Sequence, residues 1–165
     1  MQWRHNLSEL VSDSQLIPRS HATHGELQRH KEIKQVFRRS YIYAMIWEVE
    51  YTDEFGDWWS SLPKEEQVSL DASVRLLEER GPALGFPHSS KVNGSKHEHM
   101  RELRTQHHGR PLRTLYAFDP RRSAILLIGG DKTGDGRWYD KYVHLADRLY
   151  DEHIEQLRKG GLIND

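Results

Sequence analysis

Hydrophobic and polar positions alternate in one short stretch of the chain and then take a helical period. Trp47, Val49 and Tyr51 alternate with glutamates, which predicts a half-buried strand starting near Met45. Thr52 can cap a short helix directly after it, with Asp53 as the alternative cap. The apolar residues that follow have the i, i+3, i+4, i+7 spacing of one helix face: Phe55, Trp58, Trp59 and Leu62.

A second helix is predicted directly after the first. Pro63 fits its first position, and Glu65 and Glu66 suit its positive end. Gly81-Pro82 ends it. Its apolar positions form a broad stripe, which we expect to pack in a core: Val68, Leu70, Ala72, Val74, Leu76 and Leu77.

Three strands are predicted after a polar loop over residues 83–98. They cover residues 100–105, 112–118 and 124–128. The last of them is continuously apolar, which is typical of a central strand buried on both faces. Asp119-Pro120-Arg121-Arg122 forms a good turn between the second and third strands.

A closing helix is predicted over about residues 140–159, ended by Gly160-Gly161. The order of elements is therefore β-α-α-β-β-β-α. This order predicts an α+β domain with a mostly antiparallel twisted sheet, two N-terminal helices and a C-terminal helix, all on one face of the sheet.

Residues 1–44 differ from the domain expected over residues 45–165. The first 25 residues show no clear period, whereas residues 26–44 repeat an apolar side chain every four positions, as a basic amphipathic helix does. An accessory helix or nucleic-acid arm is one interpretation. The simpler one is a partly helical or disordered extension, translated from upstream of a true start at Met45.

Composition narrows the class of protein. No apolar run approaches the ~20 residues of a membrane span, so we expect no membrane partner and a cytoplasmic location. The absence of cysteine excludes disulfides and thiolate-bound zinc. A net charge of −1 argues against a protein that binds nucleic acid through its overall charge.

Basic residues are nevertheless concentrated in one region. Residues 88–113 hold two acids, Glu98 and Glu102, against six basic residues: Lys91, Lys96, Arg101, Arg104, Arg110 and Arg113. Successive strands can bring such residues to one sheet face. Fixed cations gathered there would form a phosphate site, which indicates a small nuclease acting on RNA.

Arg104, Arg113 and Lys132 are the best candidates for that phosphate site, because each lies in or at the end of a predicted strand. Guanidinium groups stay charged and match two phosphate oxygens at once. Arg101 is three residues from Arg104, so strand alternation places it on the opposite face. The alternative for each Arg is a solvated charge or a salt bridge to Glu98 or Glu102.

Proton transfer requires a group that titrates in a useful range, and His97 or Lys96 could supply it. Further RNA contacts are assigned to Lys91, His99, Arg101 and Tyr139, the last by stacking on a base. The histidines show no paired spacing on a helix, so no metal site is predicted. Residues 129–136 lack the order of a phosphate-binding loop, and no cofactor is expected.

Several segments resemble phage-derived HigB-type toxins within the RelE/ParE superfamily. They are residues 95–104, ending in Glu-Leu-Arg, the run 115–122, the apolar run 124–127 with Gly130-Asp131-Lys132, and the closing Trp138-Tyr139, Ala146-Asp147 and residues 150–153. The resemblance covers about residues 45–157. It implies a RelE-like fold, with Arg104, Arg113 and Lys132 at the family's basic positions.

The same resemblance implies the toxin half of a type II toxin–antitoxin pair. Such toxins are metal-independent mRNA endoribonucleases that act on the ribosome. The implied partners are a helix-turn-helix antitoxin, the ribosome and mRNA, with DNA reached only through the antitoxin. Two alternatives stay open: a ParE-like inhibitor that binds DNA gyrase without cutting RNA, and a degenerate module that keeps only its antitoxin interface.

Overall fold

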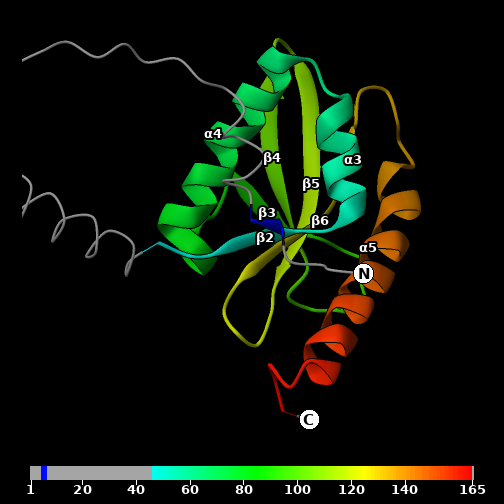
Figure 1. Ribbon diagram of the computed structural model, residues 1–165. Helices are drawn as coiled ribbons and strands as arrows, with labels where there is room; N and C mark the ends of the chain where they lie inside the picture. Colours follow the sequence, from blue (N-terminus) through cyan, green and yellow to red (C-terminus); the bar gives the residue numbers. More distant parts are fainter. Residues whose placement is uncertain (1–4, 7–45, 165) are drawn as a thin grey trace, which may run out of the picture.

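The computed structural model describes residues 5–6 and 46–164 of the chain (Figure 1). The helix expected over residues 26–44 lies outside the described residues. The elements are β1 (His5–Asn6), β2 (Val49–Tyr51), α3 (Asp53–Ser61), α4 (Lys64–Arg80), a 3-10 turn (Gly81–Ala83), β3 (Ser89–Lys91), β4 (Arg101–His107), β5 (Arg110–Phe118), β6 (Ala124–Asp131) and α5 (Trp138–Lys159).

The described strands form one six-stranded sheet in the order β1-β2-β6-β5-β4-β3. Only β2 and β6 pair in parallel; the other neighbours are antiparallel. The predicted α+β class and the order of the main elements are confirmed. The prediction lacked β1 and β3, the two edge strands. The Ser-Ser-Lys sequence of β3 has no apolar alternation, so its pairing with β4 is set by the fold and not by local pattern.

The helices cover both faces of the sheet, so the expectation of a single covered face is wrong. α3 and α4 contact β6 and β4, while α5 contacts β5 and β6 from the other side (Figure 1). The reason lies in β6, which is buried from Ala124 to Gly130 on both of its faces. A strand without a polar face requires cover on each side.

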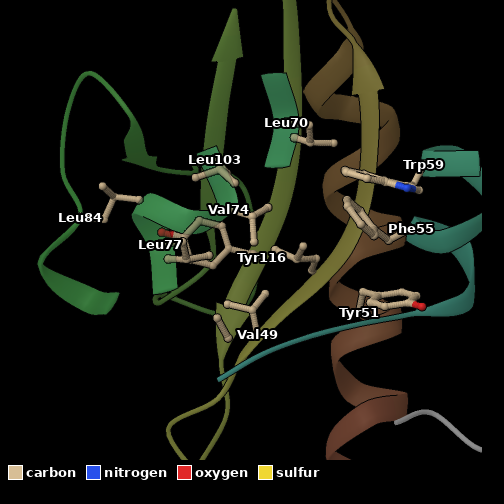
Figure 2. Packing of buried hydrophobic residues seen from close by; sticks show 12 residues of the cluster. Val49, Tyr51, Phe55, Trp59, Leu70, Val74, Leu77, Leu84, Leu103 and Tyr116 are labelled. Atoms are coloured by element: carbon tan, nitrogen blue, oxygen red, sulfur yellow. The ribbon is translucent and has the colours of Figure 1, made fainter. Parts of the chain in front are cut away.

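The first core lies between the sheet and helices α3 and α4. Phe55 and Leu70 are fully buried there against Tyr116 of β5, and Figure 2 shows these side chains together with Leu103 of β4. Thr52 caps α3, as predicted, by accepting a hydrogen bond from the Phe55 backbone N–H at 3.2 Å. The apolar stripe predicted for α4 is narrower than expected, because Val68 and Ala72 face solvent.

The second core lies between the sheet and α5. Leu115 and Ala117 of β5 contact the buried face of α5, which includes Trp138, Ala146 and Leu149. Odd-numbered β5 residues share one face, as strand alternation predicted, and the structure shows that α5 covers this face. Arg113 has the same parity, so its side chain lies on the α5 face as well.

Gly129 and Gly130 are needed at the end of β6 because tryptophans approach the backbone there. A Cβ at Gly129 would lie 1.9 Å from the Trp58 ring, and one at Gly130 would lie 2.7 Å from Trp138 Nε1. The two glycines therefore belong to β6, which extends past the end of the strand predicted over residues 124–128. They let α3 and α5 close on opposite faces of the same strand.

A buried ionic network ties β2, the β5–β6 turn and α5 together. Arg121 donates to both carboxylate oxygens of Glu50, at 3.0 and 2.9 Å, and to Asp119. His153 of α5 hydrogen-bonds Asp119 at 3.0 Å. Glu50 was expected on a polar strand face, but it is only 3% exposed. Arg121 compensates its charge, which is why a glutamate is accepted at this buried position.

Among the described helices, none combines the length and the apolar character that crossing a bilayer demands.

Gly129→Ala should lower the free energy of unfolding by about 1–3 kcal/mol, because the added methyl group overpacks the Trp58 ring. The measurement is chemical denaturation. Gly136→Ala is the matched control, since a Cβ there meets nothing within 4 Å and its φ is not positive. Equal stability of Gly129→Ala and the wild type would contradict the close approach of Trp58.

Lowering the pH should reduce the free energy of unfolding, because Asp119 becomes protonated. Burial pushes the pKa of Asp119 up, but hydrogen bonds from His153 and Arg121 outweigh burial and hold the pKa below its usual 3.8. A depressed carboxylate pKa stabilises the native state above pH ~4, and this stabilisation is lost as the pH falls through the native pKa. Asp119→Asn should lower the free energy of unfolding by about 3 kcal/mol at pH 7. It should also make the free energy of unfolding depend less on pH below pH 5.

The measurement is denaturation in a pH series. Asp151→Asn serves as a control, because that carboxylate is 45% exposed and its ion pairs are screened by solvent. An Asp119→Asn curve parallel to that of the wild type below pH 5 would contradict the role of Asp119.

Candidate functional site

Arg104 and Arg113 face each other across neighbouring strands. They are direct partners in the antiparallel pairing of β4 with β5. Directly opposed residues hold their Cβ atoms about 5 Å apart, and two like charges there destabilise a sheet unless something compensates them. Arg113 is nearly buried, with its side chain 9% exposed, whereas Arg104 is 32% exposed.

Glu102 supplies the compensation. It precedes Arg104 by two residues, so both side chains lie on the same face of β4. Its carboxylate lies 4.0 Å from Arg104 Nε and 3.6 Å from Arg113 Nε. Ser90 of β3 donates a further hydrogen bond to it at 2.8 Å. A carboxylate that is only 7% exposed therefore holds both guanidinium groups in one place.

Tyr139 and Lys132 complete the cluster from α5 and the end of β6. The Tyr139 hydroxyl donates to Glu102 Oε2 at 2.5 Å. Lys132 Nζ lies over the Tyr139 ring, 5.1 Å from its centroid. Tyr139 thus connects Lys132 to the two arginines. Contacts through Glu102 and Tyr139 therefore link the three residues predicted to bind phosphate: Arg104, Arg113 and Lys132. Their role in binding phosphate stays a prediction.

Two observations describe the electrostatics of this cluster. Burial and the hydrogen bond to Glu102 raise the pKa of Tyr139 to about 12, so its phenol stays protonated at neutral pH. Among the described residues, Arg113 Nε is buried without a hydrogen-bond partner, since Glu102 lies beyond bonding distance. Three cations against one carboxylate leave the cluster net positive, so an added anion is attracted to it.

Lys96 and His97 do not join this cluster. Both bind Asp151 on α5, Lys96 through Nζ and His97 through Nε2 at 2.9 Å. Asp151 follows Tyr139 by twelve residues, or about 18 Å of helix. Burial acts to raise the pKa of Asp151, but the hydrogen bonds from Lys96 and His97 lower it overall. Their roles in proton transfer stay predictions.

The residues predicted to contact RNA are scattered. Arg101 lies on the opposite face, as alternation predicted, and donates to Ser89 and to the Leu84 carbonyl. Its contacts are structural. His99 packs against Tyr150, with ring centroids 5.2 Å apart, and burial followed by the nearby His97 lowers its pKa. Lys91 is exposed on the edge strand β3. Of this set, only Tyr139 belongs to the cluster.

Two members of the site were not predicted as functional. Glu102 appeared only as a salt-bridge alternative, and it does bridge both arginines. The Glu-Leu-Arg spacing placed it on the face of Arg104 and could have revealed it. Phe86 lies against Arg104, with the guanidinium carbon 5.3 Å from the ring centroid. Nothing in the loop sequence indicated this contact.

Within the part of the chain that the structure describes, no group of three His, Asp or Glu side chains is arranged to hold a metal ion.

Comparison with known proteins places residues 57–151 in the family described as phage-derived protein Gp49-like. "Putative toxin HigB2" of Mycobacterium tuberculosis is 44% identical over 106 residues, which cover 63% of this chain and 53% of that protein. "Putative toxin HigB3" of the same organism is 42% identical over 105 residues, covering 63% of this chain and 90% of that protein.

The chain thus spans about half the length of HigB2 and most of HigB3. The matches confirm the resemblance to HigB-type proteins that the motifs indicated. The family match over residues 57–151 includes every residue of β4, β5 and β6, and so the whole of the cluster around Glu102. No solved structure matches the chain.

Glu102→Gln should lower the pKa of Tyr139 from about 12 toward 10, because the neutral amide removes both the charge and the carboxylate acceptor. Burial will keep the pKa above its usual value of 10. The measurement is a ¹³C NMR titration with tyrosine labelled at Cζ. Tyr150, whose pKa burial likewise raises to about 12, is the internal control and should not move. An unchanged Tyr139 pKa would contradict the contact with Glu102.

Proposed function

This chain belongs to the phage-derived Gp49-like protein family, and on that premise we propose that it is the toxin of a type II toxin–antitoxin pair and an endoribonuclease that cuts mRNA on the ribosome. The relatives named as toxins support the first part of the proposal. Its partners would be an antitoxin of the helix-turn-helix class and the translating ribosome, in the cytoplasm.

The observation that carries the proposal is the convergence of Arg104, Arg113 and Lys132 around Glu102 and Tyr139. In RNA cleavage the ribose 2′-hydroxyl loses its proton as its oxygen bonds to the neighbouring phosphorus, and the 5′-oxygen takes up a proton as its bond to phosphorus breaks. The products are a 2′,3′-cyclic phosphate and a 5′-hydroxyl. The transition state carries more negative charge on phosphorus oxygens than the substrate does, and fixed cations stabilise it selectively.

Each member of the cluster has a distinct part in this proposal. Arg104 is the more exposed of the two arginines in the cluster and would bind the scissile phosphate directly. Arg113 is buried beside Glu102 and would add fixed positive charge behind the scissile phosphate. Glu102 acts as a positioning residue, because it fixes both arginines before substrate arrives. Tyr139 stays protonated at neutral pH and donates its one hydroxyl proton to Glu102, so it would help to hold that carboxylate in place.

Arg104→Ala should reduce codon-phased mRNA cleavage by about 10²–10³-fold, by analogy with the loss of one donor to a developing oxyanion. Lys132→Ala should also reduce this cleavage. The measurement is in vitro translation followed by primer extension. Arg75→Ala is the matched control, because Arg75 pairs with Asp71 on the exposed side of α4, on the other face of the sheet.

Wild-type cutting by both Arg104→Ala and Lys132→Ala would rule out the assigned site. Loss of gyrase supercoiling without RNA cuts would instead favour the ParE-like alternative. Expression that fails to arrest growth, with the antitoxin still bound, would favour the degenerate module.

A further inference from the structure

Phe86 is the most exposed of the large apolar side chains that the structure describes, at 78%. It lies in the loop between the 3-10 turn and β3. A single exposed apolar side chain is common on proteins, so exposure alone indicates nothing. The other large apolar side chains that the structure describes as exposed are aliphatic and have no ring: Ile46, Val68 and Leu162.

The position of Phe86 is what distinguishes it. The Arg104 guanidinium lies over its ring, with the central carbon 5.3 Å from the centroid. One face of the ring thus contacts a cation of the site, and the high exposure leaves the other face open to solvent. Arg104 itself is held from behind by Glu102 at 4.0 Å. In space, the Glu102 carboxylate therefore lies next to the Arg104 guanidinium, which lies next to the Phe86 ring. The outer face of that ring is open to solvent.

We propose that Phe86 forms a base-stacking subsite in which a nucleobase of single-stranded RNA lies on the open face of the ring while Arg104 binds a phosphate of the same strand. This inference rests on the proposed function and names the part of the substrate that the site recognises. Aromatic rings bind unpaired bases by stacking, with little dependence on sequence.

Charge favours a nucleotide over an apolar protein segment as the ligand on Phe86. The ring is bordered by the partly exposed Arg104, and the cluster behind it is net positive. A nucleotide has both an anionic phosphate and a flat aromatic base. Its phosphate can bind Arg104 while its base stacks on Phe86. An apolar side chain would cover the ring but leave the guanidinium without an anion.

Binding of a 2′-O-methyl RNA decamer tests the subsite without cleavage, because the nucleophilic hydroxyl is blocked. A decamer of abasic phosphodiester units has the same charge but no bases. Fluorescence anisotropy should show that Phe86→Leu weakens binding of the RNA by about 5- to 150-fold. The same variant should bind the abasic decamer as the wild type does. Phe86→Trp should keep the affinity for RNA, since it keeps the stacking surface.

Two matched controls separate stacking from other effects. Arg104→Ala should weaken both decamers and reduce the salt dependence of binding, because it removes a phosphate contact. Val68→Ala should weaken neither, since Val68 is exposed on α4, which covers the other face of the sheet.

Equal affinity of Phe86→Leu and the wild type for RNA would overturn the proposal. Failure to bind the RNA more tightly than the abasic decamer would overturn it as well. If Phe86-dependent binding holds but translation assays show no cuts, the subsite stands and the proposed nuclease activity fails. If the protein cuts mRNA but Phe86→Leu changes neither the cutting nor the RNA affinity, the proposed nuclease activity stands and the subsite fails.

Discussion

The fold depends on a strand that has no polar face. β6 is buried along nearly its whole length, between β2 and β5, and therefore requires cover above and below. α3 and α4 supply one layer and α5 supplies the other, each with its own core. Gly129 and Gly130 extend this arrangement to the end of the strand, where a tryptophan from each layer touches the backbone. The candidate site lies beside that end, where α5 begins.

A second constraint shapes the site. Pairing of β4 with β5 sets two arginines opposite each other, and a sheet does not accept such a pair without an acid nearby. Glu102 meets this need, and the same contact fixes the direction of both guanidinium groups. Stability and preorganisation thus come from one carboxylate. The cluster nevertheless keeps an excess of positive charge over that one carboxylate.

The sequence predicted the elements whose pattern is local and strong. The helical spacing of Phe55 and Trp59, the cap at Thr52 and the apolar run of β6 were all read correctly, and the parity of Arg113 placed it on the right face. Two errors came from partners that are distant along the chain. Glu50 is buried because Arg121 reaches it from 71 residues away. β3 is a strand because β4 pairs with it, not because of its own residues.

The same limit applies to the candidate site, where local patterns could be predicted and contacts between distant segments could not. Strand alternation could place Arg104 and Arg113 on one face, but it could not show that Asp151 holds Lys96 and His97 elsewhere, since that depends on which face α5 covers. The contact of Phe86 with Arg104 depends on the path of a loop, for which the sequence has no period.

The two outermost strands of the sheet are very short. β1 has two described residues and β3 has three, so each of these edge strands offers another chain only a short stretch to pair with. Long apolar strands such as β6 lie inside and are shielded from such pairing. Among the described strands, this arrangement discourages chains from joining edge to edge, because the long apolar strand is not the one presented to a neighbouring molecule.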